Sequence, residues 1–109
     1  MGKLAPGAGR VILARRDYSK SRPTVGDVLL VIEVADSSLA YDCGEKAELY
    51  AAAGIADYWV VNLPGRCVEV RRDPQGGRYR SQRAFAGGEE LRPLAVPEAV
   101  LRAGTLWAS

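Results

Sequence analysis

The sequence predicts an α/β protein of the α+β kind, whose mixed sheet holds a βαβ unit followed by antiparallel hairpins. Two observations lead to this prediction. Between Asp27 and Leu63 an apolar run, an amphipathic segment and a second apolar run follow one another, as in a strand, a crossover helix and a parallel strand. After Leu63, alternating segments are separated by turn signals, as in hairpins. The 109 residues suit one domain, residues 1–109, with the Gly-, Ala- and Pro-rich residues 1–10 loose.

The predicted strands differ in how much of their surface is apolar. Asp27–Ala35 is apolar on both faces, which is typical of a strand in the interior of a sheet. A polar loop at Arg15–Gly26 precedes it, and glycine- and proline-containing turns separate the later strands. The remaining expected elements are strands at Val11–Ala14, Ala56–Leu63, Cys67–Arg72, Arg78–Phe85 and Leu91–Leu94, and a last helical turn at Thr105–Trp107 that buries Trp107.

One continuous helix is expected between the two parallel strands, ending near Ala53. Ser37 or Ser38 can cap its start, and Gly54 stands where a helix end favours glycine. Its opposite face carries Glu45, Glu48, Ala51 and Ala52. Helical spacing gathers the residues of the inner stripe, which faces the sheet: Leu39, Asp42, Cys43, Lys46, Leu49, Tyr50 and Ala53.

Charged side chains on these apolar surfaces need partners. Glu33 lies inside the first apolar run, and Asp42 and Lys46 lie one turn apart on the inner stripe of the helix. Because an unpaired buried charge costs several kcal/mol, Lys46 is expected to pair with Glu33 or with Asp42, and both pairings are feasible. A plain ion pair, or a lysine that reaches out to the helix edge, explains the same residues without any catalytic role.

Composition excludes several classes of site. The chain has no histidine, so Ser-His-Asp, Cys-His and HExxH sites are excluded. Cys43 and Cys67 form no CxxC pair and are expected to be reduced thiols. No apolar run approaches the roughly 18 residues of a membrane span, and the start lacks a signal peptide, so a cytoplasmic protein without a membrane partner is expected. An acidic middle segment between basic segments could place a cation near a polyanion, although solvated surface charge gives the same pattern.

The segment DVLLVIEVADSSLAYDCGEKAELYAAAGIADYWVVNL (residues 27–63) resembles the Uma-type restriction endonucleases, a family of the PD-(D/E)xK nuclease superfamily. The resemblance covers roughly residues 12–107. The combination of these sequence features is specific for the family, whereas no single feature is. The features that carry it are Glu33-Val34, Asp36–Ser38, Asp42, Gly44, Lys46, Tyr50, Gly54, Tyr58-Trp59 and the hairpin Cys67–Tyr79.

The resemblance implies a restriction-endonuclease-like core that hydrolyses phosphodiesters of DNA with a divalent cation. By position in the motif, Glu33 matches the strand carboxylate and Val34 the residue whose backbone oxygen can bind the metal. Lys46 matches the catalytic lysine that orients the attacking water, with Asp42 and Tyr50 in supporting positions. Hard oxygen ligands of this kind suit Mg²⁺ or Mn²⁺.

The sequence departs from the family pattern at one metal ligand. Relatives carry a "PD" aspartate on the strand before the long loop, at a place that corresponds to Gly7–Leu13, where this chain has no aspartate. Relatives also have a longer N-terminal part, so an N-terminally truncated, incomplete domain is expected. Asp27 lies about 20 Å from Glu33 at about 3.3 Å per strand residue and cannot share its cation. Asp17, in a loop whose course the sequence does not fix, remains a candidate substitute.

Two functions remain open at this point. The first is an endonuclease whose second acid comes from a substitute residue or from dimerisation. The second is a catalytically inactive module that binds nucleic acid or another protein. A truncated sheet would uncover edges and apolar surface, so a homodimer or a higher oligomer is expected. The arginines expected to contact phosphates, or else to form a solubilising hairpin face, are Arg71, Arg72, Arg78 and Arg80.

Overall fold

The computed structural model describes residues 8–14, 28–36 and 39–106. The loop Arg15–Gly26, the predicted caps Ser37 and Ser38, and Trp107 lie outside the described residues. The described elements are β1 (Ala8–Ala14), β2 (Val28–Ala35), α1 (Leu39–Cys43), α2 (Glu45–Ala52), β3 (Asp57–Asn62), β4 (Cys67–Gln75), β5 (Arg78–Phe85), β6 (Glu90–Leu91), β7 (Leu101–Arg102) and the 3₁₀ helix η2 (Ala103–Leu106).

The main sheet is mixed, as predicted. Its five strands follow the order β1-β2-β3-β4-β5. β2 and β3 pair in parallel, whereas the pairs β1–β2, β3–β4 and β4–β5 are antiparallel. The parallel pair follows from the βαβ unit, because a helix between the two strands returns the chain to the same end of the sheet. Every residue of β3 is buried, in keeping with its apolar stretch Tyr58–Val61 and its place at the centre of the sheet.

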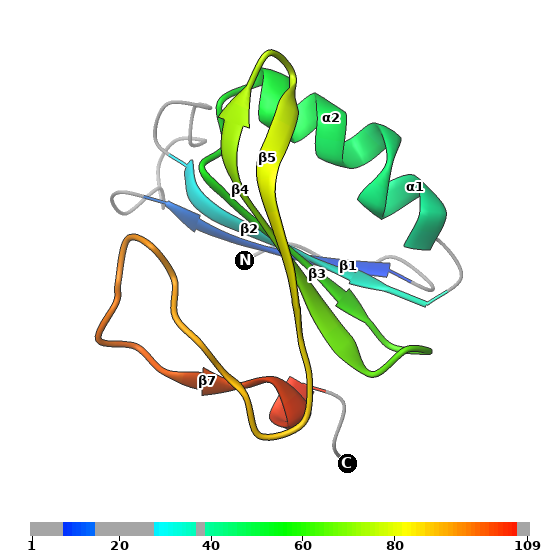
Figure 1. Ribbon diagram of the computed structural model, residues 1–109, viewed down its shortest axis with the longest axis vertical. Coiled ribbons are helices and arrows are strands. Elements are labelled where there is room, and N and C mark those ends of the chain that lie inside the picture. The colour runs from blue at the N-terminus through cyan, green and yellow to red at the C-terminus, as the bar shows by residue number, and fades with distance from the viewer. Residues whose placement is uncertain (1–7, 15–27, 37–38, 107–109) are drawn as a thin grey trace, which may run out of the picture.

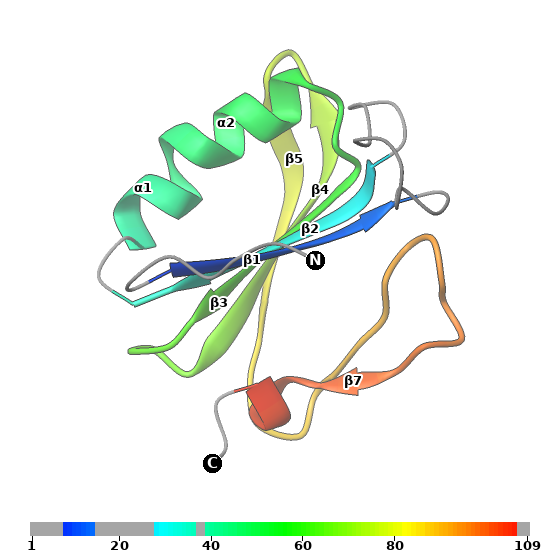
Figure 2. The same cartoon turned by 180° about the vertical axis from the view of Figure 1, so that it is seen from behind.

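Two layers cover the two faces of this sheet. α1 and α2 lie across one face, and the C-terminal segment with β6, β7 and η2 lies against the other (Figure 1). Figure 2 shows the same arrangement from behind. The helix-side core contains Val31, Ala35, Ala47, Ala51, Ile55, Tyr58, Val60 and Tyr79. The core on the other face contains Leu30, Trp59, Val61, Val68, Val70, Leu91 and Ala103.

The prediction of one continuous helix is wrong at Gly44. This residue has φ −102° and ψ −98°, outside the helical range, and separates α1 from α2. The break shifts the inner stripe of α2 by one position, so Ala47 and Ala51 are buried while Leu49 is 63% exposed. The predicted end is confirmed: Gly54 has φ +80°, and its N–H and that of Ile55 donate to Ala51 and Tyr50, a glycine-dependent helix cap.

The short elements also differ from the prediction. Residues 8–10, expected to be loose, belong to β1, and β4 extends beyond Arg72 to Gln75. The strand expected at Leu91–Leu94 is the two-residue β6, which pairs with β7, a strand that the sequence did not predict. Elements of two residues leave too little periodicity to be found from sequence. In the described part of the chain no helix is long and apolar enough to cross a membrane.

Candidate functional site

The site forms where α1 and α2 cross β2. Side chains alternate along β2, so Glu33 lies on the helix side of the sheet together with Val31 and Ala35, and it is only 2% exposed. α1 brings Asp42, which is 1% exposed, over the same strand. Lys46 follows on the first turn of α2. The strand–helix crossover therefore brings together the acids and the base that the sequence singled out.

Lys46 bridges the two acids. Its Nζ lies 3.2 Å from Glu33 Oε2 and 3.2 Å from Asp42 Oδ1, so both pairings left open by the sequence occur together. Tyr50 OH donates a 2.8 Å hydrogen bond to Glu33 Oε2. The Lys46 ammonium also lies 5.4 Å from the centroid of the Tyr41 ring, within the range of a cation–π contact.

The helix break at Gly44 contributes to this site. In a continuous helix the carbonyl of Asp42 would accept from the N–H of Lys46. In the structure that carbonyl accepts a 2.8 Å hydrogen bond from the hydroxyl of Tyr58 on β3. The rings of Tyr50 and Tyr58 pack with centroids 4.9 Å apart, so a tyrosine from the sheet fixes the backbone of one acid and packs against the tyrosine that binds the other.

The charges of the cluster reinforce one another. Burial lowers the pKa of Lys46, but its hydrogen bonds to Asp42 and Glu33 outweigh that effect, and its pKa lies above the ordinary value. Burial, together with the charges of Glu33 and Asp42, raises the pKa of Tyr58. Lys46 is therefore held as an ammonium and Tyr58 as a neutral hydroxyl at physiological pH.

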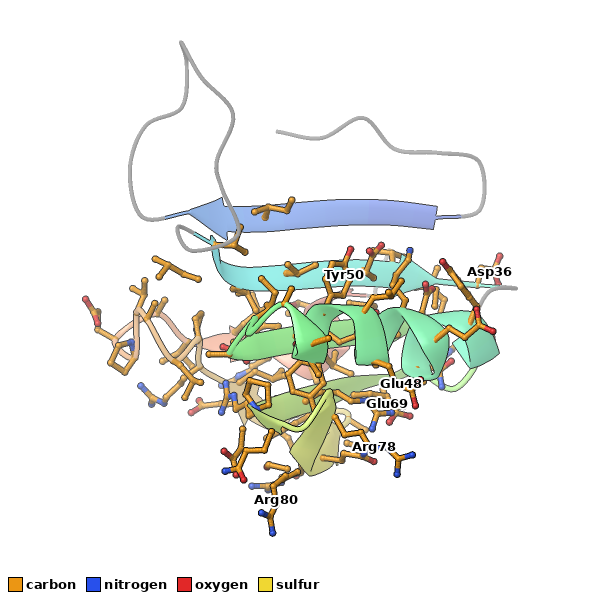
Figure 3. The ribbon with its side chains drawn as sticks, turned by 90° about the horizontal axis from the view of Figure 1, so that it is seen from above. Asp36, Glu48, Tyr50, Glu69, Arg78 and Arg80 are labelled. Carbon is orange, nitrogen blue, oxygen red and sulfur yellow. The ribbon has the colours of Figure 1, made fainter. Side chains whose placement is uncertain are left out.

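The described residues do not fit a divalent-cation site of the family type. They contain no group of three or more His, Cys, Asp or Glu side chains placed to hold a metal. β1, the strand beside Glu33, has the sequence AGRVILA and carries no acid, and its register pairs Arg10 with Glu33. Asp36 is exposed at the far end of β2 (Figure 3). Asp17 lies outside the described residues. The metal ligands that the resemblance assigns to described residues are Glu33 and the carbonyl of Val34. The carboxylate of Glu33 is already in contact with the Lys46 ammonium.

The four arginines assigned to phosphate contacts divide into two kinds. Arg71 is 7% exposed, and its Nη2 lies 3.3 Å from Glu69 Oε1. Arg72 binds Asp57 on β3, with Nε 2.9 Å from Oδ1. Arg78 and Arg80 are exposed on β5, and Figure 3 shows them on the side of the helices away from Tyr50. Arg78 and Arg80 are thus the two that lie open to a large polyanion.

Sequence reasoning missed Asp57. This residue is fully buried, and its carboxylate accepts hydrogen bonds from Trp59 Nε1 at 2.7 Å, from Arg72, and from the backbone N–H of Leu94 at 2.9 Å. Arg72 Nη2 also donates to the carbonyl of Arg92. Asp57 therefore ties the C-terminal segment to the sheet. An acid at the head of the apolar run DYWVVN was the available signal, the same one that drew attention to Glu33.

The comparisons with known proteins support this interpretation of the fold. The family model Uma2, described as "Putative restriction endonuclease", matches residues 9–104. No significantly similar curated protein or solved structure was found. The match spans nearly all of the chain and includes the strand, the helices and the hairpin that form the site described above. This chain belongs to the Uma2 family of restriction-endonuclease-type proteins.

Proposed function

We propose that this protein binds DNA with a nuclease-type core and, as a single chain, does not cleave it. Membership of the family suggests a nuclease function, and restriction-endonuclease-like families generally use divalent metals. In this chain the observation that carries the proposal is the composition of the site. Glu33 is contacted by an ammonium and a hydroxyl, and the adjacent strand places Arg10 in register with it instead of an acid.

The electrostatics of the cluster favour a structural role for the ion pairs. Two buried carboxylates that share one ammonium have their charges partly balanced, whereas a cation ligand needs oxygen lone pairs that are free to face the metal. The cluster joins β2 to both helices. Its direct consequence is therefore to hold α1 and α2 on the sheet, while DNA is bound by exposed arginines such as Arg78 and Arg80.

A second candidate is a metal-dependent DNA endonuclease, and one observation favours it. Glu33 Oε2 lies 3.2 Å from Lys46 Nζ, on the strand and helix where the family carries its catalytic pair. In this candidate Glu33 and Lys46 are the catalytic residues, supported by Asp42 and Tyr50. Glu33 and the carbonyl of Val34 would be the ligands of Mg²⁺ or Mn²⁺, and the second acid comes from outside the described residues.

One experiment separates the two candidates. Nicking of supercoiled plasmid is measured in Mg²⁺ and in Mn²⁺ for the wild type, Glu33→Gln and Lys46→Met, all purified identically. Binding of a short fluorescent duplex is measured by anisotropy in parallel. We expect duplex binding that weakens steeply with salt, as phosphate contacts require, and no nicking that depends on Glu33. Metal-dependent nicking that disappears in both variants while their duplex binding stays that of the wild type would overturn the non-cleaving function and establish the endonuclease.

The binding arm has a matched control. The double variant Arg78→Ala, Arg80→Ala removes two exposed charges from β5, and Arg102→Ala removes one exposed charge from β7 on the other face of the sheet. We expect the double variant to lower both the affinity and the salt dependence, by about 0.9 in the slope for each phosphate that the protein no longer neutralises. The Arg102 variant should bind nearly as the wild type does. Equal effects per charge removed would contradict a DNA surface on the hairpin.

A further inference from the structure

We propose that a pocket between α2 and the β4–β5 hairpin binds a single phosphate group of the DNA backbone. This inference rests on the proposed DNA-binding function and names the contact that positions the strand. The pocket is separate from the cluster of Glu33 and Lys46. Figure 3 shows Tyr50 on the flank of the helices that faces β2, and Glu48 and Arg78 on the opposite flank, toward the hairpin.

The pocket is an open cavity of about 330 Å³ with walls from both layers of the fold. Three helical residues and the glycine between the helices form one wall, and strand residues form its floor. This volume suits a group the size of phosphate with some of its hydration. The lining residues are Cys43, Gly44, Ala47, Glu48, Arg71, Arg78, Tyr79 and Gln82.

Arg71 is the observation that points to an anion. Its side chain is more than nine-tenths buried and lines the pocket. Its ion pair in the described structure is a single 3.3 Å contact with Glu69, and its Nε has no hydrogen-bond partner among the described residues. A guanidinium has five N–H donors, and leaving donors of a buried charge unsatisfied is costly. An oxyanion in the adjacent pocket would supply the missing acceptors and balance the charge.

The other polar residues of the pocket complete a donor set. Gln82 lies directly opposite Arg71 in the β4–β5 register, and both residues line the pocket. Arg78 brings a second positive charge from the same strand. Tyr79 forms part of the wall without being an available donor, because its hydroxyl already donates to the carbonyl of Ile55 at 2.6 Å. Glu48 opposes the anion, so the affinity of the pocket should increase when its charge is removed.

Cys43 provides a reporter in the pocket wall. Burial raises the pKa of its thiol, and the nearby Arg71 guanidinium partly offsets this, so the thiol reacts slowly and an occupant of the pocket can shield it further. The other cysteine, Cys67, lies outside the lining. A Cys67→Ser variant therefore has one thiol, at the pocket, and a Cys43→Ser variant has one thiol away from it.

The test measures alkylation of the single thiol by uncharged iodoacetamide, with inorganic phosphate or a short DNA duplex added and ionic strength held constant with chloride. At a phosphate concentration ten times the dissociation constant, we expect Cys43 to react about tenfold more slowly, because only the free fraction reacts. Cys67, in the Cys43→Ser protein, should be unaffected. Equal slowing of both thiols would mean a general effect of the anion and would overturn the site.

Substitutions of opposite expected sign make the test specific. Arg78→Ala and Gln82→Ala should weaken the protection of Cys43, and Glu48→Gln should strengthen it. Arg102→Ala, an exposed arginine of β7 that does not line the pocket, should leave it unchanged. These variants change exposed residues, so the test does not depend on substituting the buried Arg71. Protection of Cys43 that is unchanged by all three substitutions in the pocket, at Glu48, Arg78 and Gln82, would contradict the site.

Comparing inorganic phosphate with the DNA duplex distinguishes a failure of the pocket from a failure of the proposed DNA-binding function. Protection by both phosphate and duplex supports both. Duplex binding measured by anisotropy without protection of Cys43 overturns the pocket and leaves the function intact. Protection by phosphate without any duplex binding identifies an acceptor of free phosphate, and overturns DNA as the source together with the proposed function. No protection by either ligand overturns the pocket as a phosphate site.

Discussion

At the scale of single residues, Lys46 decides the character of the site. Its ammonium contacts Glu33 and Asp42 at 3.2 Å each, and both carboxylates are almost fully buried. Removing one member of a buried ionic group is far more harmful than the net value of the group suggests, because the remaining charges lose their compensation. The lysine is therefore a structural requirement whether or not it also takes part in catalysis.

Lys46→Met should lower the free energy of unfolding by about 3–5 kcal/mol, the range found when a buried ion pair loses one partner. Urea denaturation followed by tryptophan fluorescence measures this. The double variant Glu33→Gln, Lys46→Met should lose less than the sum of its single variants, since the glutamine no longer needs the ammonium. Strict additivity would show that the 3.2 Å contact between Lys46 and Glu33 contributes nothing to stability.

The raised pKa values of Lys46 and Tyr58 predict a loss of stability in alkali. A group whose pKa is higher in the folded state stabilises that state fully below its unfolded value, and the contribution is lost as pH rises through the folded value. We expect constant stability between about pH 7 and 8 and a progressive decrease above about pH 9, where unfolded cysteine, tyrosine and lysine lose protons while Cys43, Tyr58 and Lys46 keep theirs in the folded state. Lys46→Met should show a shallower decrease. Urea midpoints across this range are the measurement, and a rise above pH 10 would contradict it.

At the scale of elements, the short C-terminal strands depend on one buried carboxylate. Asp57 accepts from Trp59, Arg72 and the N–H of Leu94. Asp57→Asn should destabilise the protein by about 3–5 kcal/mol. The amide has no negative charge to balance Arg72, and its NH₂ group would face N–H donors that now bind the carboxylate. Amide hydrogen exchange should accelerate at Leu94 in particular. Glu90→Gln, which breaks an exposed pair with Arg92, is the control and should cost less than about 1 kcal/mol.

The register of β1 predicts that one substitution can create a cation site. Arg10 pairs directly with Glu33, and the Cβ atoms of such antiparallel partners lie about 4.5–5.5 Å apart. Arg10→Asp would place a second carboxylate within reach of one ion. We expect it to bind Mn²⁺ measurably by electron paramagnetic resonance while the wild type binds weakly. Arg10→Asn introduces a side chain of the same shape as aspartate but without its charge, so this variant should bind Mn²⁺ as weakly as the wild type does. Equal Mn²⁺ binding by the wild type and Arg10→Asp would show that a second acid is already present.

At the scale of the whole molecule, one sheet edge favours association. β1 ends the described five-stranded sheet, where it pairs with β2 on one side, and Ile12 on it is 44% exposed. Edge strands with exposed apolar side chains tend to pair with another copy. We expect a homodimer by light scattering, and Ile12→Lys should shift the protein toward the monomer. A monodisperse wild-type monomer would show that this edge is tolerated without a partner.

The sequence by itself determined the βαβ unit and the need of Lys46 for an acidic partner, Glu33 or Asp42, whereas the structure showed that Lys46 contacts both. Apolar periodicity and the helix cap at Gly54 depend on residues close together in sequence, so the strands and the helix end can be predicted from the sequence. A buried acid requires a cation nearby, so the presence of an ion pair can be predicted as well. The sequence analysis did not predict the break at Gly44, nor the contact beside it, in which the hydroxyl of Tyr58 donates to the carbonyl of Asp42 from a strand further along the chain.

Only the tertiary structure decided which arginines are available to a ligand. Arg71 and Arg72 are neighbours in sequence, yet strand alternation places one beneath the helices and the other against Asp57 on the opposite face. Their burial depends on residues far along the chain, on α1, α2 and the C-terminal segment. The local sequence pattern shows where charged residues stand. Packing between distant segments decides whether each of them contacts other residues of the protein, a phosphate group or solvent.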